Sequence, residues 1–182
     1  NDTERSVTDP ENEPASDSAW PKPLGVFIAS ALVVVVADQA SKLLALSRLT
    51  EGEYVPLIGD ILGFRLVFNP GAALGTAAGY TILLSLVAVA VVATLIFIAG
   101  RLKDRWWALG LGLFLGGAVG NLIDRLFREP SFLRGHVVDF IDYNGFFVGN
   151  IADIALTVAA IIVVVRSWQG IKFDGTGEEP AK

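Results

Sequence analysis

The sequence predicts an all-α membrane protein with four transmembrane helices and a small β-containing extracytoplasmic segment between spans one and two. Of its 182 residues, 53% are hydrophobic, and the mean hydropathy of +0.56 is too high for an ordinary soluble domain of this size. The chain contains four apolar runs that can cross the ~30 Å hydrocarbon core of a bilayer. Between the first two runs lie two β-like pieces, YVPLI and FRLVF, which are separated by glycines.

The first apolar run, at residues 24–46, is interpreted as a retained span. A cleaved signal peptide is the alternative, but the acidic residues before the run and the polar DQASK inside it count against cleavage. The charge-free stretch 70–100 predicts a second span near 80–99, followed by a tight GRLKDR turn. The third span is expected at 106–123 and the fourth at 146–165, with VVDFI between them as a short strand.

Two tails flank the membrane domain, which is expected at 24–167. Residues 1–23 contain six acidic and two basic side chains, proline and almost no aliphatic residues, which predicts a disordered acidic tail. This tail accounts for −4 of the net charge of −5, so the acidic balance of the chain indicates no particular partner. The sequence also contains no basic cluster that would predict a groove for nucleic acid. Residues 168–182 are expected to form a polar cytoplasmic tail.

Charge and tryptophan placement predict that both termini are cytoplasmic. One face of the expected bundle carries six basic residues: Lys22, Arg101, Lys103, Arg105, Arg166 and Lys172. The opposite face carries five arginines, so the charge bias alone is weak. All four tryptophans fall at the first face, as an interfacial belt would: Trp20, Trp106, Trp107 and Trp168.

With this topology, the intramembrane acids and asparagines converge on one end of the bundle, near the outer surface. The residues are Asp38 late in span one, Asn121 and Asp124 late in span three, Asn150 and Asp153 at the start of span four, and Asn69 and Asp139 in the outer loops. Polar groups at membrane depth are costly and tend to be functional. Scattered structural residues would not gather at one end, so we interpret this end as a site.

Asp139 and Asp153 are the candidate catalytic pair. No Lys or Arg lies between Arg134 and Arg166, and the near neighbours of both acids are apolar. Two desolvated carboxylates brought together would share one proton, so that one could act as general base on a water while its protonated partner polarises a carbonyl. The alternative is that both merely cap a strand end and a helix end. Asp142 is expected to be a solvated loop acid.

The remaining acids are expected to support this pair. Asp38 and Lys42 are four residues apart in the favoured order for a helical ion pair, with a direct chemical role as the open alternative. Asp124 has Arg125 beside it and Asn121 one turn earlier, which favours a hydrogen-bonded network.

Glycines and turn residues suggest how the helices approach one another. Gly112, Gly116 and Gly120 form a double GxxxG pattern in span three, which predicts close helix packing. The NPGAALG segment marks a turn that re-enters the membrane, where Asn69 could hold a peptide backbone or satisfy the turn.

Other hydrolytic machinery is missing from the sequence. There is no HExxH or GxSxG motif, no cysteine, and a single histidine, His136, which excludes thiol nucleophiles and multi-histidine metal sites. Ser41 and Lys42 could suggest a Ser/Lys protease, but adjacent helical residues point ~100° apart.

Five motifs in this order, DQASK, NPGAALG, GGAVGNLIDR, GHVVDF and NIADIA, resemble those of lipoprotein signal peptidase (signal peptidase II), a bacterial intramembrane aspartyl protease family. The resemblance covers about residues 24–166. It implies that Asp139 and Asp153 are catalytic. It also implies supporting or substrate-binding positions at Asp38, Lys42, Asn69, Gly71, Asn121, Asp124, Arg125 and Asn150.

The resemblance further implies an activity and its partners. The family cleaves diacylglyceryl-modified prolipoproteins before the lipid-bearing cysteine, without a metal or organic cofactor, and is inhibited by globomycin-type cyclic peptides. We therefore expect a monomer in the bacterial cell membrane, in contact with membrane lipid. The alternative from a different class is a small transporter or ion-conducting protein that uses Asp38, Asp124 and Asp153 as a proton relay. A purely structural membrane anchor is the third hypothesis.

Overall fold

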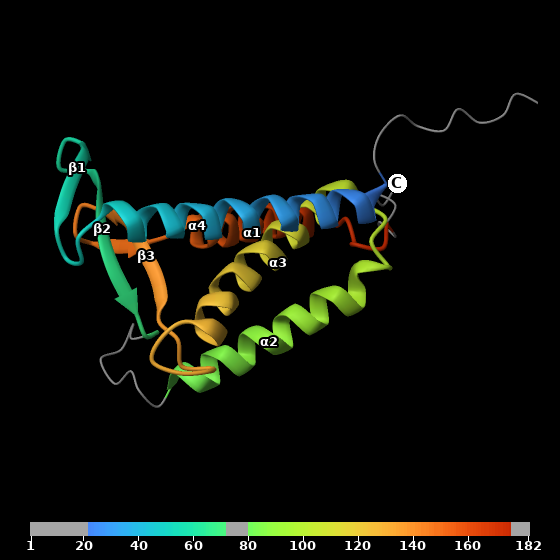
Figure 1. The fold of residues 1–182 in the computed structure, drawn as a ribbon. Coiled ribbons are helices and arrows are strands. Elements are labelled where there is room, and N and C mark those ends of the chain that lie inside the picture. The colour runs from blue at the N-terminus through green and yellow to red at the C-terminus, as the bar shows by residue number, and fades with distance from the viewer. Residues whose placement is uncertain (1–21, 72–79, 176–182) are drawn as a thin grey trace, which may run out of the picture.

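The computed structural model describes residues 22–71 and 80–175 (Figure 1). The predicted disordered tail therefore lies almost wholly outside the described residues, as do most of the NPGAALG turn and the end of the C-terminal tail. Within these residues, four helices are long and apolar enough to cross a membrane: α1 Pro23–Arg48, α2 Tyr80–Ala99, α3 Arg105–Phe127 and α4 Ile151–Trp168. The predicted four-span arrangement is confirmed to this extent.

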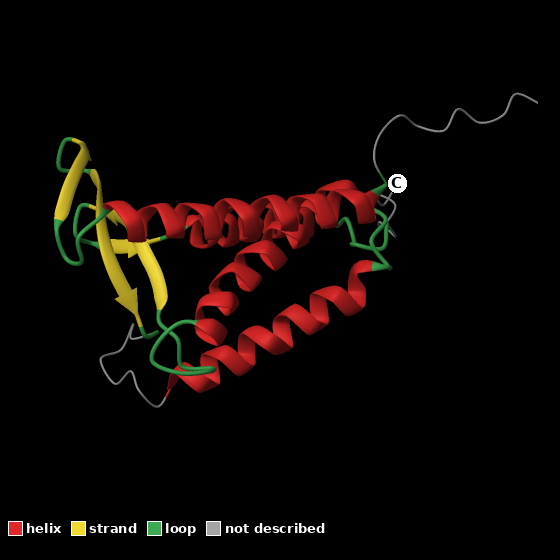
Figure 2. Cartoon of the chain, in the orientation of Figure 1, coloured by secondary structure: helices red, strands yellow, loops and turns green. Residues whose placement is uncertain are grey.

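An antiparallel sheet covers one end of the helices. Its four strands, in the order β1-β2-β3-β4, are β1 Tyr54–Ile58, β2 Leu62–Asn69, β3 Val137–Tyr143 and β4 Phe147–Gly149. Figure 2 shows the strands gathered where α1 ends and α4 begins, away from the end where α1 begins and α4 ends. The sequence predicted β-like pieces between spans one and two and a short VVDFI strand between spans three and four, and these form β1, β2 and β3. It did not predict that the strands pair in one sheet, nor that β4 extends it.

The fourth helix begins later than the predicted residue 146. Asn144 and Gly145 have φ angles of 57° and 71°, and the Phe146 amide donates to the Tyr143 carbonyl at 3.1 Å. This is the geometry of a tight hairpin turn, for which Asn-Gly is a strong signal. The apolar residues after the turn therefore enter β4, and the helix starts only at Ile151.

Helix α3 packs against the other three helices and uses its glycines to approach α1 and α4 closely. A Cβ on Gly116 would lie 2.6 Å from Cβ of Val34 and 2.7 Å from the carbonyl oxygen of Ala31, both in α1. A Cβ on Gly120 would lie 2.6 Å from a carboxylate oxygen of Asp38. The predicted close packing is confirmed, and it brings the polar residues of α1 and α3 into contact.

Replacing Gly116 with alanine is expected to lower the free energy of unfolding by ~1–3 kcal/mol, because the added methyl overpacks the α1–α3 contact. Thermal unfolding in detergent micelles measures this. Gly100→Ala is the matched control, since a Cβ there meets nothing within 4 Å, and it should change stability by less than ~0.5 kcal/mol. Equal melting temperatures for the two variants would contradict the packing account.

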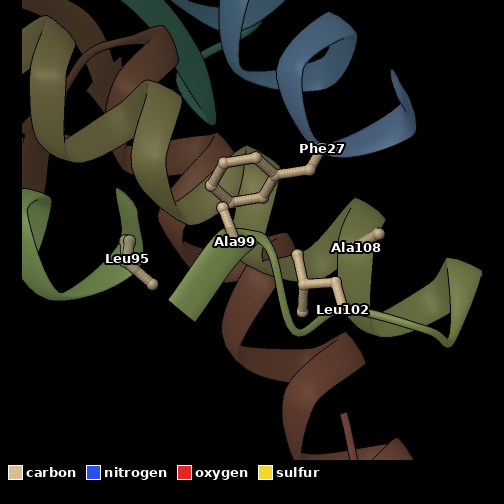
Figure 3. Close-up of a cluster of buried hydrophobic side chains, with 5 residues drawn as sticks. All are labelled: Phe27, Leu95, Ala99, Leu102 and Ala108. Atoms are coloured by element: carbon tan, nitrogen blue, oxygen red, sulfur yellow. The ribbon is translucent and has the colours of Figure 1, made fainter. Parts of the chain in front are cut away.

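The apolar core lies at the opposite end from the sheet. Phe27, Leu95, Ala99, Leu102 and Ala108 form a buried cluster contributed by α1, α2, the link and α3 (Figure 3). Beside it, the Asp104 side chain accepts from the Trp107 amide at 2.8 Å and pairs with Arg166 at 2.5 Å. This leaves the sheet end of the bundle for the polar residues.

Candidate active site

Asp139 and Asp153 come together at the sheet end of the bundle, held by one shared neighbour. Asp139 lies in β3 with 2% exposure, and Asp153 lies in the first turn of α4. The Asn150 side-chain nitrogen Nδ2 donates to Asp139 Oδ1 at 2.6 Å, while its backbone nitrogen donates to Asp153 Oδ2 at 3.1 Å. Two carboxyl groups, one from β3 and one from α4, therefore flank a single asparagine.

The local sequence explains why α4 starts with this geometry. Asn150 is the N-cap, and its side-chain oxygen accepts from the Asp153 amide at 3.1 Å, while Asp153 bonds back to the Asn150 amide. This reciprocal capping box fixes the first turn. Capping and a role in catalysis are compatible for Asp153, because its two carboxylate oxygens have different partners. Asp153 Oδ2 serves the cap, and Oδ1 faces Asn121.

Two further asparagines orient the remaining carboxylate oxygens. Asn69, at the end of β2, donates from Nδ2 to Asp139 Oδ2 at 2.9 Å. Its own oxygen accepts from the Gly71 amide at 2.8 Å, and Gly71 has a φ of 93°, a conformation that favours glycine. Asn121 in α3 donates from Nδ2 to Asp153 Oδ1 at 3.0 Å. Each carboxyl group thus accepts two hydrogen bonds.

A fully buried ion cluster lies beside the pair. Lys42 Nζ is 2.8 Å from Asp38 Oδ2, 2.8 Å from Asp124 Oδ2 and 3.1 Å from Asn121 Oδ1. The predicted Asp38–Lys42 pair is confirmed. Asp38 Oδ1 accepts from the Ala152 amide at the start of α4 at 3.0 Å, and Asp124 Oδ2 accepts from the Val138 amide in β3 at 3.2 Å. The cluster therefore holds the two segments that carry the candidate catalytic acids.

The supporting network expected around Asp124 is present, but its ionic partners are Lys42 and Arg128 and not the neighbouring Arg125. Asp124 Oδ1 accepts from Arg128 Nε at 2.6 Å, because a residue four positions later lies on the same helix face. Arg125 points elsewhere, with Nη2 3.6 Å from the position that a Cβ on Gly71 would take. It interacts electrostatically with Asp139 and Asp153. The sequence predicted no cation close to Asp139 and Asp153, and this is wrong in the folded protein because Arg125 lies near both.

Asp142 is also placed differently from the prediction. It was expected to be solvated, but its side chain is 0% exposed and lies 2.7 Å from Arg65 Nε. The reason is that Asp142 belongs to β3 and faces β2, a pairing that cannot be read from local sequence.

Sequence reasoning did not single out Gln39. Its side-chain nitrogen donates to Asp38 Oδ2 at 3.1 Å and to the Gly120 carbonyl at 3.0 Å, which ties α1 to α3. A polar residue inside an apolar run, next to Asp38, was the available signal. Ser41 forms no pair with Lys42 in this arrangement. Its hydroxyl donates to the Asp38 carbonyl at 2.9 Å, while the Lys42 ammonium bonds to the cluster.

Burial changes the acidity of Asp139. The pKa of this carboxyl is raised from 3.8 to about 6, chiefly because burial disfavours its charged form, with the negative charge of Asp153 adding to the effect. Hydrogen bonds from Asn69 and Asn150 and the charge of Lys42 act in the opposite direction. Asp139 therefore keeps its proton to a higher pH than an ordinary aspartate does.

A mostly apolar cavity of about 540 Å³ leads to Asp153. It is lined by Tyr143, Phe146, Phe147, Gly149, Asn150, Asp153, Ile154, Thr157 and Val158. Ile154 and Val158 are each 41% exposed on the outside of α4, so the cavity continues onto the apolar surface of that helix. An apolar chain in this cavity would lie against a carboxylate, an arrangement suited to hydrolysis of a membrane-embedded substrate.

Comparison with known proteins agrees with this chemistry. Residues 30–169 match the family model described as signal peptidase (SPase) II. The lipoprotein signal peptidase of Rhodococcus jostii (strain RHA1) is 44% identical over 180 residues, covering 96% of this chain and 91% of that protein. The lipoprotein signal peptidase of Mycolicibacterium smegmatis is 46% identical over 171 residues, covering 94% of this chain and 73% of that protein.

Solved structures give the same result. One bacterial membrane enzyme is 30% identical with a TM-score of 0.68, covering 79% of this chain and 92% of that chain. A second is 27% identical with a TM-score of 0.69, covering 86% and 95%. The chain therefore belongs to the signal peptidase II family and is an aspartic peptidase.

Proposed function

We propose that this protein removes the signal peptide from diacylglyceryl-modified prolipoproteins by cleaving before the lipid-bearing cysteine, with Asp139 and Asp153 as its catalytic pair. The observation that carries the proposal is the meeting of these two acids around Asn150, next to an apolar cavity. Family membership supports the reaction class, and the named relatives are lipoprotein signal peptidases.

The raised pKa of Asp139 supports placing the proton on this residue at the start of the reaction. Asp153, ionised, takes a proton from a water molecule whose oxygen attacks the scissile carbonyl carbon. Asp139 donates its proton to the carbonyl oxygen, which gives a neutral tetrahedral diol. Asp153 then returns its proton to the leaving nitrogen as the C–N bond breaks, and Asp139 regains a proton from the collapsing diol.

The supporting residues hold this geometry. Asn69, Asn121 and Asn150 orient the carboxyl groups, Gly71 permits the turn that carries the Asn69 contact, and Arg125 supplies nearby positive charge. The ion cluster anchors α4 and β3: Lys42 pairs with both Asp38 and Asp124, which in turn accept from the amides of Ala152 and Val138. These eight positions act by positioning rather than by bond making.

We further propose that the protein is a monomer in the bacterial cell membrane, with both termini cytoplasmic and the sheet end near the outer surface. The basic residues at the end away from the sheet support this orientation, since cytoplasmic ends of spans carry excess Lys and Arg. A lipid-anchored substrate could then reach Asp153 from the bilayer along the exposed face of α4. Globomycin-type peptides would occupy the same cavity.

Incubating the purified protein with a diacylglyceryl-modified lipobox peptide tests the proposal. We expect a product whose first residue is the lipidated cysteine, identified by mass spectrometry, and its loss when globomycin is added. The proton-relay transporter alternative predicts instead ion flux in reconstituted vesicles and no cleavage. Family membership argues against that alternative.

The pH dependence of cleavage should report the Asp139 proton. Because Asp139 must be protonated and its pKa is raised to about 6, kcat/KM should fall as the pH rises through about 6. Asn69→Ala removes a hydrogen bond that lowers this pKa, so the midpoint of the fall should move to higher pH. A midpoint that stays in place or moves to lower pH would contradict the assignment.

A further inference from the structure

A second buried acid lies in the same strand as Asp139 but takes no part in the chemistry above. Asp142 is fully buried and forms an ion pair with Arg65 at 2.7 Å, whereas the Arg65 side chain is 38% exposed. Burying a carboxylate is costly unless it is paired, so Arg65 compensates the buried charge of Asp142.

Arg65 reaches Asp142 because of an irregularity in the sheet. Phe64 pairs with Ile141 and Val67 pairs with Asp139, so two residues of β2, Arg65 and Leu66, lie opposite one residue of β3. A bulge of this kind re-aims the side chains at that point. The bulge thus separates the part of β3 that carries Asp139 from the part that carries Asp142.

Two neighbours fix the guanidinium in place. The Arg65 guanidinium carbon lies 5.4 Å from the centre of the Tyr54 ring, a cation–π contact across β1 and β2. Gly63, two residues earlier in β2, leaves the space that this ring fills, since any side chain there would collide with Tyr54. Arg65 is therefore held between an aromatic ring and a carboxylate.

Asp142 also contacts the turn between β3 and β4. Its Oδ1 accepts from the Gly145 amide at 2.5 Å, in the turn whose residues Asn144 and Gly145 have positive φ angles. The turn sets the positions of Tyr143 and Phe147, whose rings stack with their centres 6.0 Å apart. Arg65, Asp142 and the turn form one continuous chain of contacts.

The β3–β4 hairpin, which contains this turn, forms one wall of the cavity beside Asp153. Tyr143, Phe146 and Phe147 all line that cavity. At Gly149, a Cβ would lie 2.6 Å from the Phe147 ring and 3.0 Å from Asp153 Oδ2, so the ring and the candidate catalytic carboxylate border the same space. A shift of the hairpin would change the width of the cavity without touching the contacts of Asp139.

We propose that Arg65, acting through Asp142, is a positioning residue that sets the aromatic β3–β4 wall of the cavity and thereby determines how tightly the apolar substrate segment next to the scissile bond binds. The substrate part of this inference rests on the proposed function. The pair should affect substrate binding more than the chemical step, because neither residue contacts the carboxyl groups of Asp139 or Asp153.

Kinetics with the lipobox peptide test this inference. Arg65→Gln should raise KM about tenfold, because the buried Asp142 carboxylate loses its cationic partner, and should change kcat by less than about twofold. Arg65→Lys should restore part of the lost affinity, since it keeps the charge but not the fork geometry. The double variant Arg65→Gln/Asp142→Asn should match the single variant, because both act through one contact. Arg134→Gln, an exposed arginine outside this chain of contacts, is the control.

Hydrogen exchange of the backbone amides gives a readout that needs no substrate. The amides of Gly145 and Phe146 should exchange faster in Arg65→Gln, while those of α1 and α3 stay unchanged. If wild-type protein cleaves the peptide but Arg65→Gln leaves both KM and this exchange unchanged, the inference is overturned and the proposed function stands. If wild-type protein does not cleave, the proposed function fails, and unchanged exchange would still refute the positioning role. Equal losses in kcat and in melting temperature would indicate a merely structural role.

Discussion

Replacing Asp139 or Asp153 with asparagine is expected to lower the rate of lipobox peptide cleavage by at least ~10²-fold, the lower range for loss of a positioned acid or base. Asparagine keeps the size of the side chain and can still accept a hydrogen bond from Asn69 or Asn121 through its oxygen. Asparagine cannot act as a general acid or a general base at neutral pH. The measurement is kcat with saturating peptide, with product quantified by mass spectrometry.

The matched controls separate chemistry from folding. Both variants should insert into membranes and melt within a few degrees of the wild type, because the ion cluster around Lys42 is untouched. Ser41→Ala should behave like wild type, since Ser41 only bonds to the carbonyl of its own helix. Retained cleavage in either aspartate variant would overturn the catalytic assignment.

The second large effect concerns stability. Lys42→Met should destabilise the protein by ~3–5 kcal/mol, the cost of breaking a buried charge pair by removing one partner. Asp38 would then lose its cationic partner in a fully buried site, whereas Asp124 would keep Arg128. Thermal or denaturant unfolding in detergent measures the change, and activity should fall with it because Asp38 holds the first turn of α4.

Two further variants make this prediction specific. Lys42→Met/Asp38→Asn should recover part of the lost stability, because the neutral amide needs no counter-charge and its oxygen can still accept from the Ala152 amide. Lys103→Met, an exposed lysine at the other end of the bundle, should change stability by less than ~0.5 kcal/mol. A double variant less stable than Lys42→Met would argue against an unpaired Asp38 as the cause.

The sequence could predict the helices because their signal is local. Apolar length defined α2 at residues 80–99, and the glycine spacing of α3 indicated the close approach to α1. The Asp38–Lys42 pair was predictable for the same reason, since both residues lie on one helix face. The gathering of acids at one end followed from topology alone.

Contacts between distant segments could not be predicted in this way. The burial of Asp142 depends on the pairing of β3 with β2, and Arg125 in α3 lies beside Gly71, more than fifty residues earlier in the chain. The late start of α4 had a local signal, the Asn-Gly turn, which the continuous apolar run obscured. The strands YVPLI, FRLVF and VVDFI had local signals, but their pairing could not be predicted, because strand partners far apart in the chain leave no periodic trace.

If Asp139 and Asp153 lie close enough to share a proton, the titration of the Asp139 carboxyl must depend on the charge of Asp153. Carbon-13 NMR of labelled aspartate, with the Asp139 signal assigned by its loss in Asp139→Asn, should give a pKa of about 6 in the wild type. In Asp153→Asn the pKa should fall, because the negative charge that raises it is gone. The same Asp139 pKa in both proteins would show that the two carboxyl groups do not interact and would contradict the account.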